Sequence, residues 1–190
     1  MKNLVKFCRT IPGVAVITLL ILSVPFVAMQ FTNEVNWSVS DFVIMGILVF
    51  STMLAYVLIS RYAPGFIYRA AIGLAIGATF LMVWANLAVG LIGSGPHAGN
   101  LMYIGVVAVV IVGTYFSKLA AKGMELVMFG AALSLMLLAA IALLVNMQAY
   151  PGSSVGEIIG VNAFFVMLYT VSGLLFRYIA PERQAQKSAS

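Results

Sequence analysis

Six stretches of about 20 predominantly apolar residues run through this chain, and each is long enough for a helix to cross a hydrocarbon layer roughly 30 Å thick. Charged residues make up only 8% of the chain, whereas soluble domains carry about 25%, so lipid must be its main solvent. The sequence predicts an all-α, polytopic transmembrane bundle of six helices. The predicted spans are 11–31, 41–60, 69–93, 101–117, 123–147 and 155–177.

The apolar runs show no period-2 alternation, which excludes a transmembrane β-barrel. The breaks between them carry turn residues, such as Pro64-Gly65 and Pro151-Gly152. Residues 178–190 form a short tail, and the length leaves no room for a soluble domain. We expect one integral membrane domain that covers residues 1–190.

The basic residues all fall on one side of a six-span topology, because the first, third and fifth loops contain no Lys or Arg. The positive-inside rule then places both termini in the cytoplasm. The net charge of +5 therefore reflects topology and the lipid bilayer as partner, and it does not indicate nucleic-acid binding. These residues are Lys2, Lys6, Arg9, Arg61, Arg69, Lys118, Lys122, Arg177, Arg183 and Lys187.

The first apolar run has an alternative interpretation as a cleaved signal peptide, since basic residues precede it. Its length and the bulky Phe26 near a cleavage site at Ala28 favour a retained span. Cys8 is the only cysteine, which excludes an internal disulfide and predicts a free thiol.

Ionisable residues deep in a membrane are costly and usually functional, and the predicted spans hold none at their centres. Glu125 lies three residues after Lys122, and we expect a surface ion pair at a helix N-terminus. This pattern argues against a proton relay, haem ligation or an intramembrane protease. We predict no catalytic residues, no metal site, no cofactor and no enzymatic activity.

Three asparagines lie within the predicted spans, at Asn86, Asn146 and Asn162. Such side chains form hydrogen bonds between transmembrane helices or line a polar path. We favour interhelical hydrogen bonds, and the polar path is the alternative.

A candidate polar cluster lies on the predicted outer face. Carboxylates and an imidazole can bind a divalent cation or respond to pH. The residues come from three loops without ligand spacing, so solvated loops and helix caps are favoured over a binding site. Ser38-x-x-Asp41 and Ser154-x-x-Glu157 match the capping-box pattern, with a duplicated helical hairpin as the alternative. The cluster comprises Glu34, Trp37, Asp41, His97 and Glu157.

Small residues spaced four apart allow transmembrane helices to approach closely. We expect Gly73 with Gly77, Gly156 with Gly160, and Gly130 with Ser134 to form packing seams within the monomer. A dimer face is the alternative.

Two segments carry a family resemblance: Asn33-Glu34-Val35-Asn36-Trp37, and Trp84 to Gly93 followed by Asn100-Leu101-Met102-Tyr103. They resemble a family of small, uncharacterised multi-pass bacterial membrane proteins over roughly the first four spans. The resemblance implies a bacterial inner membrane and supplies no activity. Where that family has an acidic, Asn-Pro-containing turn, this chain has Gly95-Pro96-His97-Ala98-Gly99.

Two functional hypotheses follow. The first is a non-enzymatic accessory or interaction subunit that binds a membrane protein partner or forms a homo-oligomer. The second is a small permease or channel with an outer polar vestibule near Trp37, Trp84, Asn86 and His97.

Overall fold

A computed structural model describes residues 10–61, 63, 65–93 and 97–188, with side chains in the last helix described to residue 180. These residues form helices and turns without strands, and six of the helices are long and apolar enough to cross a membrane. The predicted all-α fold with six spans is confirmed. Several residues of the predictions above lie outside the described part, namely Lys2, Lys6, Cys8, Arg9, Pro64, Gly95 and Pro96.

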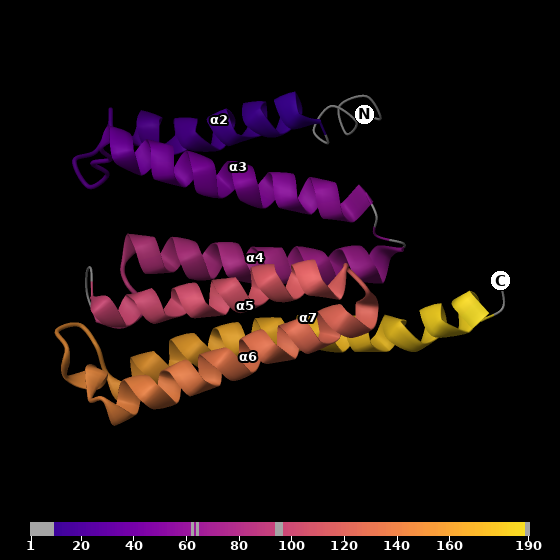
Figure 1. Cartoon of the computed structure of the whole chain (residues 1–190). Coiled ribbons are helices and arrows are strands. Elements are labelled where there is room, and N and C mark those ends of the chain that lie inside the picture. Colours follow the sequence, from indigo (N-terminus) through magenta and orange to yellow (C-terminus); the bar gives the residue numbers. More distant parts are fainter. Residues whose placement is uncertain (1–9, 62, 64, 94–96, 189–190) are drawn as a thin grey trace. The chain divides into compact units, whose positions relative to one another are not determined.

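The chain divides into two compact units, residues 1–62 and 63–190. Unit 1 contains α2 (Ile11–Ala28) and α3 (Val39–Arg61), which run antiparallel (Figure 1). The Thr10 hydroxyl caps α2 by accepting from the Gly13 amide at 3.2 Å. Helix α2 continues through Pro25 and ends three residues later, at Ala28.

The predicted capping box starts α3. The Asp41 carboxylate accepts from the Ser38 amide at 2.7 Å, and the Ser38 hydroxyl accepts from the Asp41 amide at 3.3 Å. The two helices approach closely at Gly46, where an added Cβ would lie 3.3 Å from Leu22.

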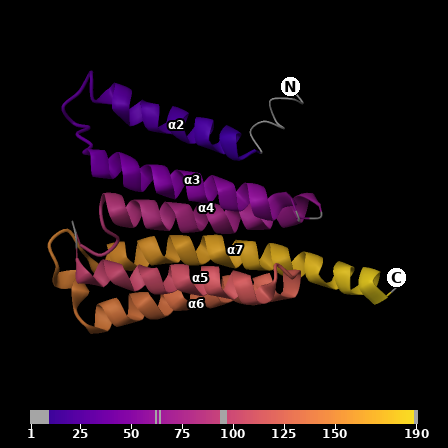
Figure 2. The same cartoon turned by 45° about the horizontal axis from the view of Figure 1, so that its top comes forward.

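Unit 2 contains four long helices and two short 3-10 turns. Along the bundle α4 packs on α7, α7 on α6 and α6 on α5, whereas α4 and α5 make little contact along their lengths. The four helices alternate in direction (Figures 1 and 2). The elements are α4 (Phe66–Ala88), η1 (Ala98–Leu101), α5 (Met102–Ser117), α6 (Ala121–Leu144), η2 (Met147–Ala149) and α7 (Val155–Ser188).

Glycines form the seams inside unit 2, although not all of those predicted. An added Cβ at Gly113 of α5 would lie 2.8 Å from Val127 of α6, and one at Gly173 of α7 would lie 3.1 Å from Phe129. The predicted seam at Gly130 contacts Val109 at 3.7 Å.

Within unit 2, the predicted seam at Gly156 and Gly160 is not formed. Both glycines are exposed, and nothing lies within 4 Å of an added Cβ at either. The same open space surrounds Gly77 of α4. The GxxxG spacing places two glycines on one helix face, but it does not determine which neighbour that face meets.

Two helix ends differ from the predicted boundaries. Helix α4 ends at Ala88 rather than residue 93, because Gly90 and Gly93 adopt positive φ values of 78° and 71°, which glycine tolerates at helix ends. Helix α7 continues to Ser188, so most of the predicted tail is helical. Figures 1 and 2 show this segment extending beyond the ends of α5 and α6.

Candidate functional site

The five residues of the predicted outer cluster are divided between the two units. Among the described residues, no group of three His, Cys, Asp or Glu side chains is placed to hold a metal ion. Within unit 1, Asp41 caps α3, Glu34 is exposed, and Trp37 packs edge-on against Phe42 with ring centroids 5.3 Å apart. These contacts give the three residues roles in the α2–α3 connection.

The other two members of the cluster belong to unit 2. The Glu157 amide donates to the Ser154 hydroxyl at 3.1 Å, which is half of the predicted capping box. His97 stacks on Tyr150, with ring centroids 4.1 Å apart and planes 11° apart. This stacking joins the α4–η1 loop to the α6–α7 connection.

The three asparagines predicted inside the spans have different environments. Asn162 of α7 is 2% exposed; its Nδ2 donates to the Tyr103 hydroxyl of α5 at 3.1 Å. Asn146 lies at the end of α6 in a left-handed conformation, with φ 62°, and accepts from Gln148 at 2.7 Å. Asn86 Nδ2 donates to the Asn100 carbonyl at 3.0 Å. Asn162 and Asn86 therefore connect separate elements, and Asn146 terminates a helix.

Asn100 organises the loop between α4 and α5, a role that sequence reasoning missed. Its side-chain oxygen accepts from the Leu91 and Ile92 amides at 3.0 and 2.9 Å, and its Nδ2 donates to the Ile92 carbonyl at 3.3 Å. The side chain thereby satisfies backbone groups left free where α4 ends. We refer to Asn86 and Asn100 as the asparagine clasp. The sequence signal that could have predicted this role is an amide residue that follows two glycines interrupting an apolar run.

A groove of about 830 Å³ lies between α4 and α5, beside the clasp. Met82 and Val83 of α4 and Val107 of α5 line its deeper part, and Asn86 and His97 line it near the helix ends. It lies where the two consecutive helices diverge. A volume of this size is within the range of small-molecule sites, about 300–1,000 Å³.

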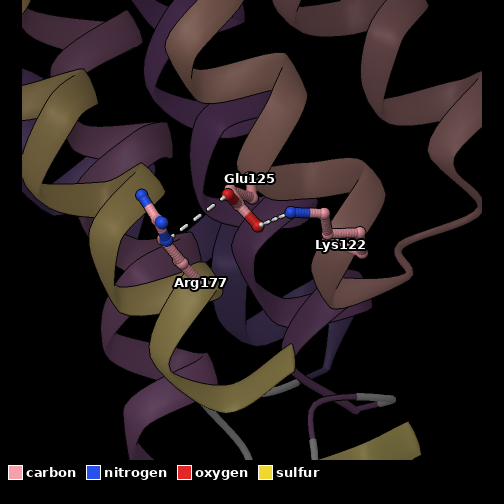
Figure 3. A network of polar contacts seen from close by, with 3 residues as sticks. All are labelled: Lys122, Glu125 and Arg177. Carbon is pink, nitrogen blue, oxygen red and sulfur yellow. Dashed lines mark hydrogen bonds and ion pairs between the residues drawn. The ribbon is translucent and has the colours of Figure 1, made fainter. Parts of the chain in front are cut away.

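The prediction that Glu125 forms a surface ion pair needs correction, because Glu125 is buried. The pair with Lys122 exists, at 2.9 Å, but the Glu125 side chain is only 5% exposed, and Arg177 of α7 lies 4.0 Å from its other oxygen (Figure 3). Glu125 lies in the second turn of α6, where α7 covers it. The buried carboxylate and its two exposed basic partners thus link α6 to α7. Without those partners, the buried charge would be costly.

Further polar contacts join α4 to α7. The Thr79 and Tyr169 hydroxyls lie 2.9 Å apart, and the Ser172 hydroxyl donates to the Ala71 carbonyl at 2.9 Å. The Tyr68 hydroxyl of α4 donates to the Leu119 carbonyl in the α5–α6 turn. These polar groups hold unit 2 together.

No protein-family model, curated protein or solved structure matches this chain. The geometry therefore carries the functional argument. It offers an apolar groove with one polar end and an exposed glycine face on α7.

Proposed function

We propose that this protein is a non-enzymatic subunit of a bacterial inner-membrane assembly, and that it binds a transmembrane helix of another membrane protein. The α7 face formed by Gly156, Gly160 and Ala163 carries the proposal, because all three residues are exposed. They are spaced at i, i+4 and i+7, so they share one side of the helix. Small residues in such a row allow another helix backbone to approach closely in lipid.

The use of polar side chains in unit 2 supports a binding role over transport. Tyr103 bonds Asn162, and Thr79 bonds Tyr169, so these groups serve helix packing. A permease requires polar groups that face a path.

The topology within the inner membrane is supported by the one-sided distribution of Lys and Arg, and by the family resemblance of the Asn33–Trp37 and Trp84–Gly93 segments.

A small permease is the second candidate, and the groove at Asn86 and His97 is the observation that favours it. The groove resembles the expected vestibule in carrying polar groups near the helix ends. Its deeper lining is Met82, Val83 and Val107, which offers no polar continuation. The helix-binding role is therefore the better supported.

The decisive experiment places a photo-cross-linking amino acid at Ala163 in the full chain, expressed in its native membrane. We expect one stoichiometric cross-linked membrane protein, and we expect Gly160→Leu to abolish the product. Gly105→Leu is the matched control, because Gly105 is also an exposed helical glycine with nothing within 4 Å of an added Cβ.

Other outcomes have defined meanings. A cross-linked product made of two copies of this chain would identify a homo-oligomer as the occupant of the face. An absence of any product, together with solute flux in reconstituted vesicles, would replace the binding role with transport. Loss of the product in both glycine variants would show that the α7 face is not the contact.

A further inference from the structure

The groove between α4 and α5 combines apolar walls with a polar end. Leu87, Leu101 and Ile104 line it and are 58%, 65% and 61% exposed, so it is open along the side of the helices. For helices in a membrane, that side faces lipid chains. The groove does not include the α7 face at Gly156 and Gly160, so a ligand here would be independent of the proposed helix partner.

The polar end presents one hydrogen-bond acceptor that lacks a partner. Asn86 Nδ2 donates to the Asn100 carbonyl, but Asn86 Oδ1 is closed to solvent and accepts no hydrogen bond among the described residues. The His97 ring, which also lines the groove, stacks on Tyr150. A buried acceptor without a donor is unfavourable, and a ligand that supplies a donor removes this penalty.

The charged residues around the groove decide which polar group a ligand can place there. Neither 89–101 nor 145–154, the segments that meet through the His97–Tyr150 contact, contains Lys or Arg. A phosphate headgroup would find no lysine or arginine there, whereas an uncharged hydroxyl needs none. Asn86 also lies two residues before the end of α4, so in a membrane-spanning α4 it lies near an end of the span, where the polar part of a lipid is expected.

We propose that the α4–α5 groove binds an uncharged lipid alcohol. Its hydrocarbon chain lies against Met82, Val83 and Val107, and its hydroxyl donates to Asn86 Oδ1 beside the His97 imidazole. Because Oδ1 is closed to solvent, side chains beside Asn86 must move as the ligand enters. A side opening between α4 and α5 allows that entry directly from the bilayer.

The test uses the full chain in phosphatidylcholine nanodiscs and a diacylglycerol with a photoactivatable group in one acyl chain. Two matched probes carry the same acyl chains, one with the hydroxyl methylated and one with it phosphorylated. Mass spectrometry then maps the labelled peptides. We expect labelling of α4 and α5 at the groove, about fivefold stronger for the free alcohol than for the methyl ether, as one net hydrogen bond provides.

A variant pair locates the site. Ile104→Trp fills the groove and should abolish the labelling, whereas Ile111→Trp should retain it. Ile111 is a matched control because it lies on the same helix with 62% exposure and does not line the groove. The comparison of probes on the unmodified chain decides the question even if Ile104→Trp fails to fold.

Equal labelling by the alcohol and its methyl ether would overturn the proposal, as would stronger labelling by the phosphorylated probe. Labelling outside the groove would overturn it too. A photoactivatable isoprenoid alcohol forms a further arm. Stronger groove labelling by that probe would support the lipid-alcohol class and identify its hydrocarbon as isoprenoid rather than acyl.

Discussion

Asn162 of α7 donates to the hydroxyl of Tyr103 on α5 over 3.1 Å, and both side chains are 2% exposed. This hydrogen bond crosses unit 2 between two helices that α6 separates in the packing order. In lipid, no water competes for such a bond, although the measured contribution of such bonds to stability is modest.

Tyr103→Phe should therefore destabilise the protein by about 0.6 kcal/mol and by no more than about 1.7 kcal/mol, the average and the maximum measured for interhelical hydrogen bonds in a membrane protein. The measurement is the unfolding midpoint in mixed micelles of increasing denaturing detergent. Tyr178→Phe is the control, since Tyr178 is 64% exposed on α7. An equal shift in both variants would show that the Tyr103–Asn162 bond contributes nothing specific.

The asparagine clasp should be sensitive to small chemical changes. Asn100→Ala leaves the Leu91 and Ile92 amides without their acceptor, at roughly 1–3 kcal/mol for a buried donor. Asn100→Asp keeps the acceptor but sets an oxygen against the Ile92 carbonyl and buries a negative charge, so we expect a loss at least as large. Hydrogen exchange of the Leu91 and Ile92 amides measures the effect of both substitutions. Unchanged protection in Asn100→Ala would contradict the role given to this side chain.

Because the Glu125 carboxylate is buried, replacing either of its two basic partners should destabilise the protein. Lys122→Met removes the 2.9 Å contact and should destabilise the protein by about 1–3 kcal/mol, more than Arg177→Met, which removes the 4.0 Å contact. Adding Glu125→Gln to Lys122→Met should recover part of the loss, because it removes the buried charge. Thermal unfolding of the four proteins, including the unmodified chain, tests this order. No recovery in the double variant would show that charge burial is not the cause.

Two glycines of α5 provide a matched test of helix packing. Gly113→Ala should destabilise unit 2 by about 1–3 kcal/mol, since the new Cβ would lie 2.8 Å from Val127 of α6. Gly105→Ala places its Cβ in open space and should be neutral or slightly stabilising, as alanine favours helices. Unfolding midpoints of the two variants measured side by side decide between packing and propensity as the cause.

The apolar runs and their breaks predicted the six spans, because the hydrocarbon layer sets a length that any crossing helix must meet. The capping pattern likewise predicted the start of α3, since Ser38 and Asp41 act within one turn. These features depend on residues that are close in sequence.

The arrangement of the helices was not predictable in the same way. Lipid-facing and protein-facing surfaces are both apolar, so neither α5 nor α6 shows an amphipathic pattern that identifies its neighbour. The burial of Glu125 depends on α7, which brings Arg177 from 52 positions later in the chain. The glycine pair of α7 has the spacing of a seam and faces outward, whereas Gly113, which has no partner glycine nearby, forms one. The candidate groove exists because α4 and α5 diverge, and that divergence has no local sequence signal.

The packing order α4–α7–α6–α5 has a consequence for biogenesis. Helix α4 relies on α7 for its main contacts, yet α7 is translated after α4, α5 and α6. A nascent chain that has inserted the first three helices of unit 2 therefore still exposes the α4 surface that Thr79 and Ala71 later bring to α7. Insertion of α7 is the step that completes the unit, and a chain stalled before it would leave this surface of α4 uncovered and open to membrane quality control.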